Sequence, residues 1–266
     1  MKMSLCVSVL CCATSYSLMV QAACMQPPSC EELGFTVDAS KCSGAALKCP
    51  WDLSKAACNE KEEIEIGSIL YGDGTVASGI VTGKTPIGVV FDTANRLAVA
   101  LTDVKEDGTA GSETMYWSSD YCYTPGLQNC TTTEIPTGTN LTPITCGVDG
   151  RLNTNAILAS TCNGTIYAAT ATNNYQPAGC TKDFCKKSKW FLPSLRDLQN
   201  IYLQRTQIDA SLTLLKAYSA TTLRNEYYWS STGDYNYAWK FGMYDGYRAS
   251  NGKSGSTGDV RPVLAF

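Results

Sequence analysis

The chain has 266 residues, of which 44% are hydrophobic and 17% charged, so it can bury a real core as one large domain with room for a small appendage. A formal net charge of −3, a pI near 5.1 and the lack of any basic stripe argue against a nucleic-acid partner. The chain has no histidine, which excludes Ser-His-Asp and Cys-His nucleophile pairs and histidine-ligated zinc. We therefore do not expect an enzyme.

Residues 1–22 have the pattern of a signal peptide. Lys2 supplies a positive start, an apolar run follows it, and small residues close the segment at Ala22. Lipid anchoring at Cys24 is the less favoured alternative, because Gln21 stands where lipoprotein signals prefer leucine. We expect a secreted, periplasmic or cell-surface protein with no membrane insertion after cleavage.

The cysteines fit an oxidising compartment. Three of the fourteen lie within the signal peptide, and the remaining eleven predict disulfides with one cysteine left over, which we expect to be Cys24. The candidates for disulfides are Cys30, Cys42, Cys49, Cys58, Cys122, Cys130, Cys146, Cys162, Cys180 and Cys185. In the second half, pairing between neighbours along the chain would give Cys122–Cys130, Cys146–Cys162 and Cys180–Cys185.

The chain divides by composition. Residues 23–58 form a small cysteine-rich segment that is too short to bury a core alone, and the charged residues 59–65 are the expected linker. The main domain, 66–266, opens with strand-like runs at 64–71, 85–91 and 96–101, and the last two are separated by a hairpin-length turn. Tyr116-Trp117-Ser118-Ser119 recurs at residues 228–231, which suggests two similar strand ends in one sheet.

Helices are expected at 154–160 and 167–175, and a third begins at Ser194. Ser194 followed by Asp197 predicts a capping box, with Leu195, Leu198 and Ile201 on one buried face. Asp209 is expected to cap a further helix. Strands then return at 227–230, 238–241 and 260–265.

Several of these segments, taken together, resemble a known group. The segments are Ile66–Gly74, Pro86–Phe91, Trp190–Ser194, Tyr228–Thr232, Ala238-Trp239 and Arg261–Phe266. Their order resembles the bacterial domain of unknown function at the C-terminus of the Legionella collagen-like adhesin, which is similar to the formylglycine-generating-enzyme and C-type-lectin-like superfamily. The resemblance implies an α+β fold, with a small twisted antiparallel sheet, flanking helices and long disulfide-stapled loops. It also implies a secreted or surface-attached bacterial protein. It carries over neither copper chemistry, since the last cysteine is Cys185, nor calcium-dependent sugar binding, since those signatures are missing.

The resemblance and the composition converge on residues 233–258 as a binding surface. In related domains this segment carries variable ligand-binding positions, and tyrosine with Ser, Gly and Asn is typical of recognition surfaces. The candidate ligand-binding residues are Tyr235, Asn236, Tyr237, Tyr244, Asp245, Tyr247, Arg248 and Asn251. Trp229, Trp239, Phe241, Pro262 and Val263 are expected to be framework, and Arg261 to hold a local carboxylate or carbonyls.

The leading hypothesis is an exported, non-catalytic recognition or adhesion module that binds a protein or a glycan, with no catalytic residues, no cofactor and no metal. One alternative is a polysaccharide-acting enzyme that uses two carboxylates such as Asp234 and Asp245. Another is a structural cell-surface component cross-linked by its odd cysteine. A calcium site among Asp245, Asn251 and Asp259 is conceivable, although no loop signature supports it.

Overall fold

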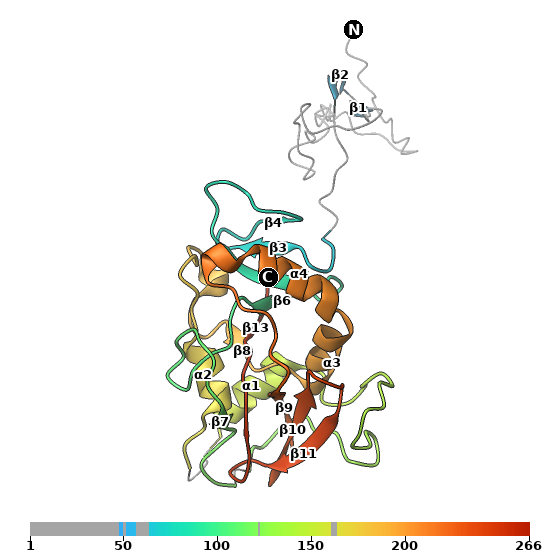
Figure 1. Cartoon of the computed structure of the whole chain (residues 1–266), viewed down its shortest axis with the longest axis vertical. Coiled ribbons are helices and arrows are strands. Elements are labelled where there is room, and N and C mark those ends of the chain that lie inside the picture. The colour runs from blue at the N-terminus through green and yellow to red at the C-terminus, as the bar shows by residue number, and fades with distance from the viewer. Residues whose placement is uncertain (1–47, 50–51, 57–63, 122, 161–163) are drawn as a thin grey trace, which may run out of the picture. The chain divides into compact units, whose positions relative to one another are not determined.

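A computed structural model of the chain describes residues 48–49, 52–56, 64–121, 123–160 and 164–266 (Figure 1). The expected signal peptide, Cys24, Cys30, Cys42, Cys58, Cys122 and Cys162 lie outside these residues. The chain forms two units, residues 1–63 and 64–266. In the first unit, β1 (Lys48–Cys49) pairs antiparallel with β2 (Asp52–Ala56).

The second unit is built around a six-stranded antiparallel sheet in the order β4-β3-β5-β6-β13-β8. Its strands are β3 (Ile69–Tyr71), β4 (Val76–Ala77), β5 (Pro86–Asp92), β6 (Leu97–Ala100), β8 (Trp190–Phe191) and β13 (Val263–Ala265). The predicted strands at 85–91 and 96–101 are β5 and β6, and the turn between them is present. The unit is therefore α+β with antiparallel sheets, as expected.

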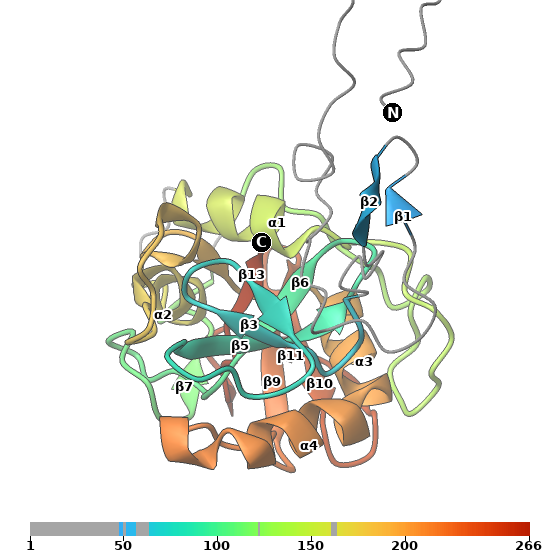
Figure 2. The ribbon, with the colours of Figure 1, turned by 90° about the horizontal axis from the view of Figure 1, so that it is seen from above.

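Helices cover both faces of this sheet, which explains why its strands are apolar without alternation. The helices are α1 (Gly150–Leu158), α2 (Ala168–Asn174), α3 (Leu195–Leu203) and α4 (Arg205–Leu214), with single 3-10 turns at η2 (Asp183–Cys185) and η3 (Lys216–Tyr218). Val89 and Val99 pack in one core cluster with residues of α3 and α4, whereas Val90 and Ala98 pack in a second cluster with residues of α1 and α2. Figure 2 shows the sheet between α4 on one side and α1 on the other.

Helix α3 begins as its sequence predicts. The Ser194 hydroxyl accepts from the Asp197 amide at 3.1 Å, and the Asp197 carboxylate accepts from the Ser194 amide at 2.8 Å, which completes the capping box. The expectation for Asp209 is wrong, because α4 already begins at Arg205 and Asp209 lies inside it. Its carboxylate instead accepts from the Arg205 guanidinium and from the backbone amide of Leu223. None of the helices in the described part combines the length and hydropathy that a membrane span requires.

A second, three-stranded antiparallel sheet carries the C-terminal stretch, in the order β11-β10-β9. Its strands are β9 (Tyr227–Gly233), β10 (Tyr237–Gly242) and β11 (Arg248–Gly252), while β12 (Thr257–Gly258) pairs separately with β7 (Met115–Tyr116). The two Tyr-Trp-Ser-Ser segments therefore do not share a sheet, contrary to expectation. They brace each other instead: the Trp117 indole donates to the Ser230 carbonyl at 3.1 Å, and the Trp229 indole donates to the Met115 carbonyl at 2.9 Å.

Two disulfides lie within the described residues, Cys130–Cys146 and Cys180–Cys185. The expected Cys180–Cys185 pairing is present. The pairings Cys122–Cys130 and Cys146–Cys162 are wrong, because the loop between Cys130 and Cys146 folds back and brings their Cα atoms to 5.3 Å. Each disulfide is also hydrogen-bonded to a core tryptophan. The Trp239 indole N–H donates to the Cys130 carbonyl, and the Trp190 indole N–H donates to the Cys185 carbonyl, both at 2.8 Å.

Candidate functional site

The expected framework residues of the C-terminal stretch are buried. Trp229, Trp239 and Phe241 are almost fully shielded from solvent, as are Pro262 and Val263. Trp239 and Phe241 join the core cluster that contains α3, whereas Trp229 joins the cluster that contains α1. Strands β9 and β10 are thus enclosed on both faces, whereas β11 is half-buried from Ala249 to Gly252. The most exposed side chains of this sheet lie in the turns at its ends.

The predicted binding residues divide between the two ends of this sheet. Tyr237 pairs with Gly252 at one end of β10, while Phe241 pairs with Arg248 near the other. A six-residue strand separates its ends by about 17 Å, at about 3.3 Å per residue. Tyr235, Asn236, Tyr237 and Asn251 therefore lie at one end and Tyr244, Asp245, Tyr247 and Arg248 at the other. The predicted continuous 233–258 surface does not form.

At the first end, three tyrosines are exposed in and beside the β9–β10 turn. Tyr235 is 55% exposed, Tyr237 49% and Tyr123 62%. The ring of Tyr123 lies 5.8 Å from that of Tyr235, centroid to centroid, so a loop distant in sequence extends the aromatic surface. We call Tyr123, Tyr235 and Tyr237 the tyrosine tip.

At the second end, the predicted residues behave differently from one another. Tyr244 is exposed, but Tyr247 is half-buried and packs edge-on against Tyr227 with ring centroids 6.4 Å apart. Arg248 as a ligand contact is wrong, because it is only 1% exposed. It shares the face of Phe241 through strand pairing and donates to the Thr142 carbonyl at 2.6 Å, and burial lowers the pKa of its guanidinium.

Tyr235 and Tyr237 of the tyrosine tip lie in and beside the β9–β10 turn, whose backbone is hydrogen-bonded to a buried lysine. Asp234 caps the turn, since its carboxylate accepts from the amides of Asn236 at 3.0 Å and Tyr237 at 2.8 Å. Lys253 is fully buried; its ammonium donates to the Asp234 carbonyl and lies 4.3 Å from the centroid of the Trp117 ring. Its backbone amide donates to the Asn236 carbonyl at 3.1 Å. Both sides of the turn are therefore fixed to one residue.

Burial lowers the pKa of Lys253 to about 8, although Asp234 acts in the opposite direction. A base whose pKa is lower in the folded than in the unfolded protein binds fewer protons when folded, so stability rises with pH through that interval. Between pH 8 and 10 we expect the free energy of unfolding of the natural protein to rise relative to that of Lys253→Met by on the order of 2 kcal/mol. Urea unfolding of both proteins across this pH range measures the difference.

The matched control is Lys216→Met, because Lys216 is exposed on η3. Its stability should follow that of the natural protein at every pH. A constant difference between Lys253→Met and the natural protein from pH 8 to 10 would show that Lys253 does not titrate in this range.

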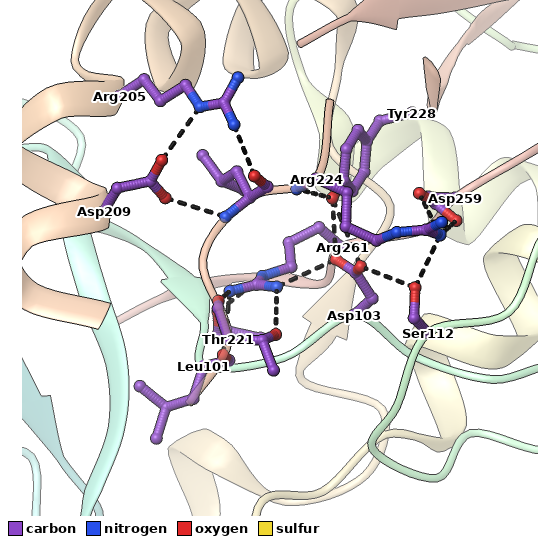
Figure 3. A network of polar contacts seen from close by, with 12 residues as sticks. Leu101, Asp103, Ser112, Arg205, Asp209, Thr221, Arg224, Tyr228, Asp259 and Arg261 are labelled. Carbon is purple, nitrogen blue, oxygen red and sulfur yellow. Dashed lines mark hydrogen bonds and ion pairs between the residues drawn. The ribbon is translucent and has the colours of Figure 1, made fainter. Parts of the chain in front are cut away.

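A buried network of charges fixes the segment that leads into β9 (Figure 3). The Arg261 guanidinium donates to Asp103 at 3.0 Å and to the backbone carbonyls of Ala100, Leu101 and Thr221 at 2.7–2.9 Å, which confirms that it holds a carboxylate and carbonyls. The Tyr228 hydroxyl donates to the same Asp103 carboxylate at 3.2 Å. Since Arg261 and Asp103 are both shielded from solvent, this pair is structural.

Beside it, Arg224 donates one guanidinium nitrogen to both carboxylate oxygens of Asp259, at 2.8 and 2.9 Å, and to the Ser112 hydroxyl. Burial and the neighbouring Asp103 raise the pKa of Asp259 to about 7, against the lowering effect of Arg224. Burial also raises the pKa of the Tyr228 phenol above its usual range. The network therefore crowds several acidic groups around two guanidiniums, with Arg261, Asp103 and Asp259 buried and Arg224 and Ser112 at its exposed edge.

The carboxylates proposed for catalysis or for calcium are not brought together. Asp234 and Asp245 lie in turns at opposite ends of β10, and each accepts backbone amides of its own turn. Asn251 lies at the Asp234 end of the sheet, and Asp259 is engaged by Arg224. Among the described residues, no three Cys, Asp or Glu side chains are grouped so as to hold a metal ion.

We compared the chain with protein families, curated proteins and solved structures. No family model matches it, and no curated protein matches it. Among solved structures it is similar to the crystal structure of a fimbrial protein from Bacteroides ovatus, with a TM-score of 0.45 and 16% sequence identity over 76% of this chain and 49% of that chain. The chain thus spans about half the length of that protein.

Proposed function

We propose that this chain is an exported, non-catalytic recognition module that contacts a protein or glycan through the tyrosine tip. The observation that carries the proposal is the combination of exposed aromatic rings with an immobilised turn. Tyr235 and Tyr237 project from a turn whose carbonyls are bonded to the buried Lys253. A pre-organised aromatic surface loses little conformational entropy on binding, so more of the contact energy appears as affinity.

Export is supported by the two disulfides, which persist in oxidising compartments. Membership of the C-type-lectin-like superfamily belongs to the same proposal. It rests on the motif order described above, and the motif residues occupy buried strands β3, β5, β8, β9 and β13. We therefore propose a surface adhesion role for a domain of that kind.

The test compares two variants on a glycan and surface-protein array. We expect the double variant Tyr235→Ala/Tyr237→Ala to bind its ligand at least about 10-fold more weakly, because aromatic anchors at the centre of an interface dominate its affinity. Tyr244→Ala is the matched control, since Tyr244 is also an exposed tyrosine but lies at the opposite end of the sheet. Equal array profiles for the double variant and the natural protein would refute the tyrosine tip as the contact surface.

A further inference from the structure

The outer edge of β11 carries backbone groups that point away from its own sheet. β11 pairs with β10 on one side, and their register places Gly252 opposite Tyr237. The amide and the carbonyl of Arg248 face the other side, where they bond to Gly138 at 2.9 and 3.1 Å. Because backbone groups alternate between the two sides of an antiparallel strand, Ser250 and Gly252 also turn theirs away from β10.

Three of these outward groups have no hydrogen-bond partner within the part of the chain that the structure describes. They are the Ser250 amide, the Ser250 carbonyl and the Gly252 amide. The Gly252 carbonyl, in contrast, accepts from the Gly255 amide at 3.2 Å. Backbone groups without a partner are rare in protein interiors, and both Ser250 and Gly252 are half-buried rather than buried. The three groups are therefore open to solvent or to another chain.

The chain itself occupies this edge for one residue pair only. Gly138 pairs antiparallel with Arg248 as an isolated bridge, and a continued strand would bring Pro136 opposite Ser250. Proline has no N–H to donate to the Ser250 carbonyl. Gly138 also has a φ of +123°, which regular strands do not adopt. The edge is thus paired at Arg248 and open from Ser250 onward.

The spacing of the open groups selects the class of ligand. An extended polypeptide turns an N–H and a C=O to the same side at every second residue, about 7 Å apart, as Ser250 and Gly252 do. Addition of an extended segment to an exposed strand is a recurring mode of protein recognition. Building on the proposed function, we infer that the ligand is a protein, which binds through an extended segment paired with β11 at Ser250 and Gly252.

An added segment would lie beside the tyrosine tip. Gly252 is the partner of Tyr237 in the sheet, and neighbouring strands are about 4.8 Å apart, so the segment would run roughly 10 Å from the Tyr237 backbone. The Tyr237 side chain is 49% exposed, and its ring together with a side chain of the segment can span that distance. The edge of β11 would supply the backbone contacts of the interface, and the tyrosine tip its aromatic contacts.

The test begins with a phage-displayed library of random linear peptides of about 10 residues, the length of a long strand, selected on the full chain. A selected peptide is synthesised, and calorimetry measures its affinity for each variant. We expect Ser250→Pro to bind it at least about 10-fold more weakly, because proline removes the outward N–H and obstructs pairing at an edge. The pairing with β10 is retained, since Ala249 and Asn251 provide it. Ser250→Ala is the matched control; it keeps the N–H and should bind as the natural protein does.

Amide hydrogen exchange of the natural chain tests the same pairing without a substitution, in case Ser250→Pro does not fold. The Ser250 and Gly252 amides should exchange at least about 10-fold more slowly when the peptide is bound. Failure to select any peptide, equal affinity of a folded Ser250→Pro, or unchanged exchange at both amides would overturn the inference. If Tyr235→Ala/Tyr237→Ala still loses its array ligand, such a result refutes only the strand pairing and leaves the tyrosine tip as the contact surface.

Discussion

Replacing Arg261 with methionine is expected to lower the free energy of unfolding by about 3–5 kcal/mol, because it leaves the Asp103 carboxylate buried without its cation. Asp103 is 2% exposed, and its ion pair with Arg261 is 3.0 Å long. The substitution also removes the donors that satisfy the carbonyls of Ala100, Leu101 and Thr221. Urea unfolding followed by tryptophan fluorescence measures the loss.

The control for Arg261→Met is Arg96→Met. Arg96 is exposed; it donates to the Phe266 carbonyl at 2.9 Å and stacks on the Phe266 ring, and its loss should cost less than about 1 kcal/mol. The double variant Arg261→Met/Asp103→Asn should recover part of the lost stability, because it no longer buries an unpaired charge. A cost for Arg261→Met as small as that for Arg96→Met would contradict the structural role of the network.

The elements that the sequence predicted well are those encoded by neighbouring residues. The capping box of Ser194 and Asp197 needs only residues within one turn, and helix α3 begins there. Asp209 shows the limit of the same approach. It is a good capping residue in isolation, but its partners are Arg205 and the amide of Leu223, and the latter comes from a segment beyond the helix. The contact between Asp209 and the Leu223 amide depends on the tertiary fold, so local sequence patterns do not predict it.

The division of the predicted binding residues between two ends of a sheet could not be predicted from the sequence, for a related reason. β11 has the sequence Arg-Ala-Ser-Asn-Gly, which lacks the β-branched and aromatic residues typical of strands, so the sequence alone predicts no strand there. Its pairing with β10 places the turn that carries Tyr244 at the far end of the sheet and turns Arg248 toward the interior. Once β11 is known to pair with β10, the separation between the β9–β10 turn and the β10–β11 turn follows from the length of β10.

The sequence does not predict the roles of Lys253 and Tyr123, because each contacts the β9–β10 turn only through the tertiary fold. Lys253 lies in a Gly- and Ser-rich loop that resembles exposed linker, yet it is fully buried against Trp117. The repeated Tyr-Trp-Ser-Ser segment is the sequence feature that relates to Lys253, because the tryptophan of each copy contacts a buried lysine through its ring face. Lys240 lies 4.7 Å from the Trp229 ring centroid, as Lys253 lies 4.3 Å from that of Trp117.

Gly72→Ala is expected to destabilise the protein by about 3 kcal/mol or more, because its new Cβ would lie 1.6 Å from the Gly179 carbonyl oxygen. Neither backbone can easily move. The Gly72 amide donates to the Thr85 carbonyl at 3.0 Å, and the Gly72 carbonyl accepts from the Thr181 amide at 3.2 Å. The backbone conformation of Gly72 is not in the left-handed region, so the cost is one of space alone.

Gly79→Ala is the matched control, since it adds the same methyl group where no atom lies within 4 Å and should change stability by less than about 0.5 kcal/mol. Urea midpoints of the two variants give the comparison, and failure of Gly72→Ala to fold would count as the larger effect. Equal stability of the two would mean that the contact between Gly72 and Gly179 is looser than its geometry indicates. Because Gly179 also lines a cleft of about 620 Å³, the contact between Gly72 and Gly179 holds one wall of that cleft in position.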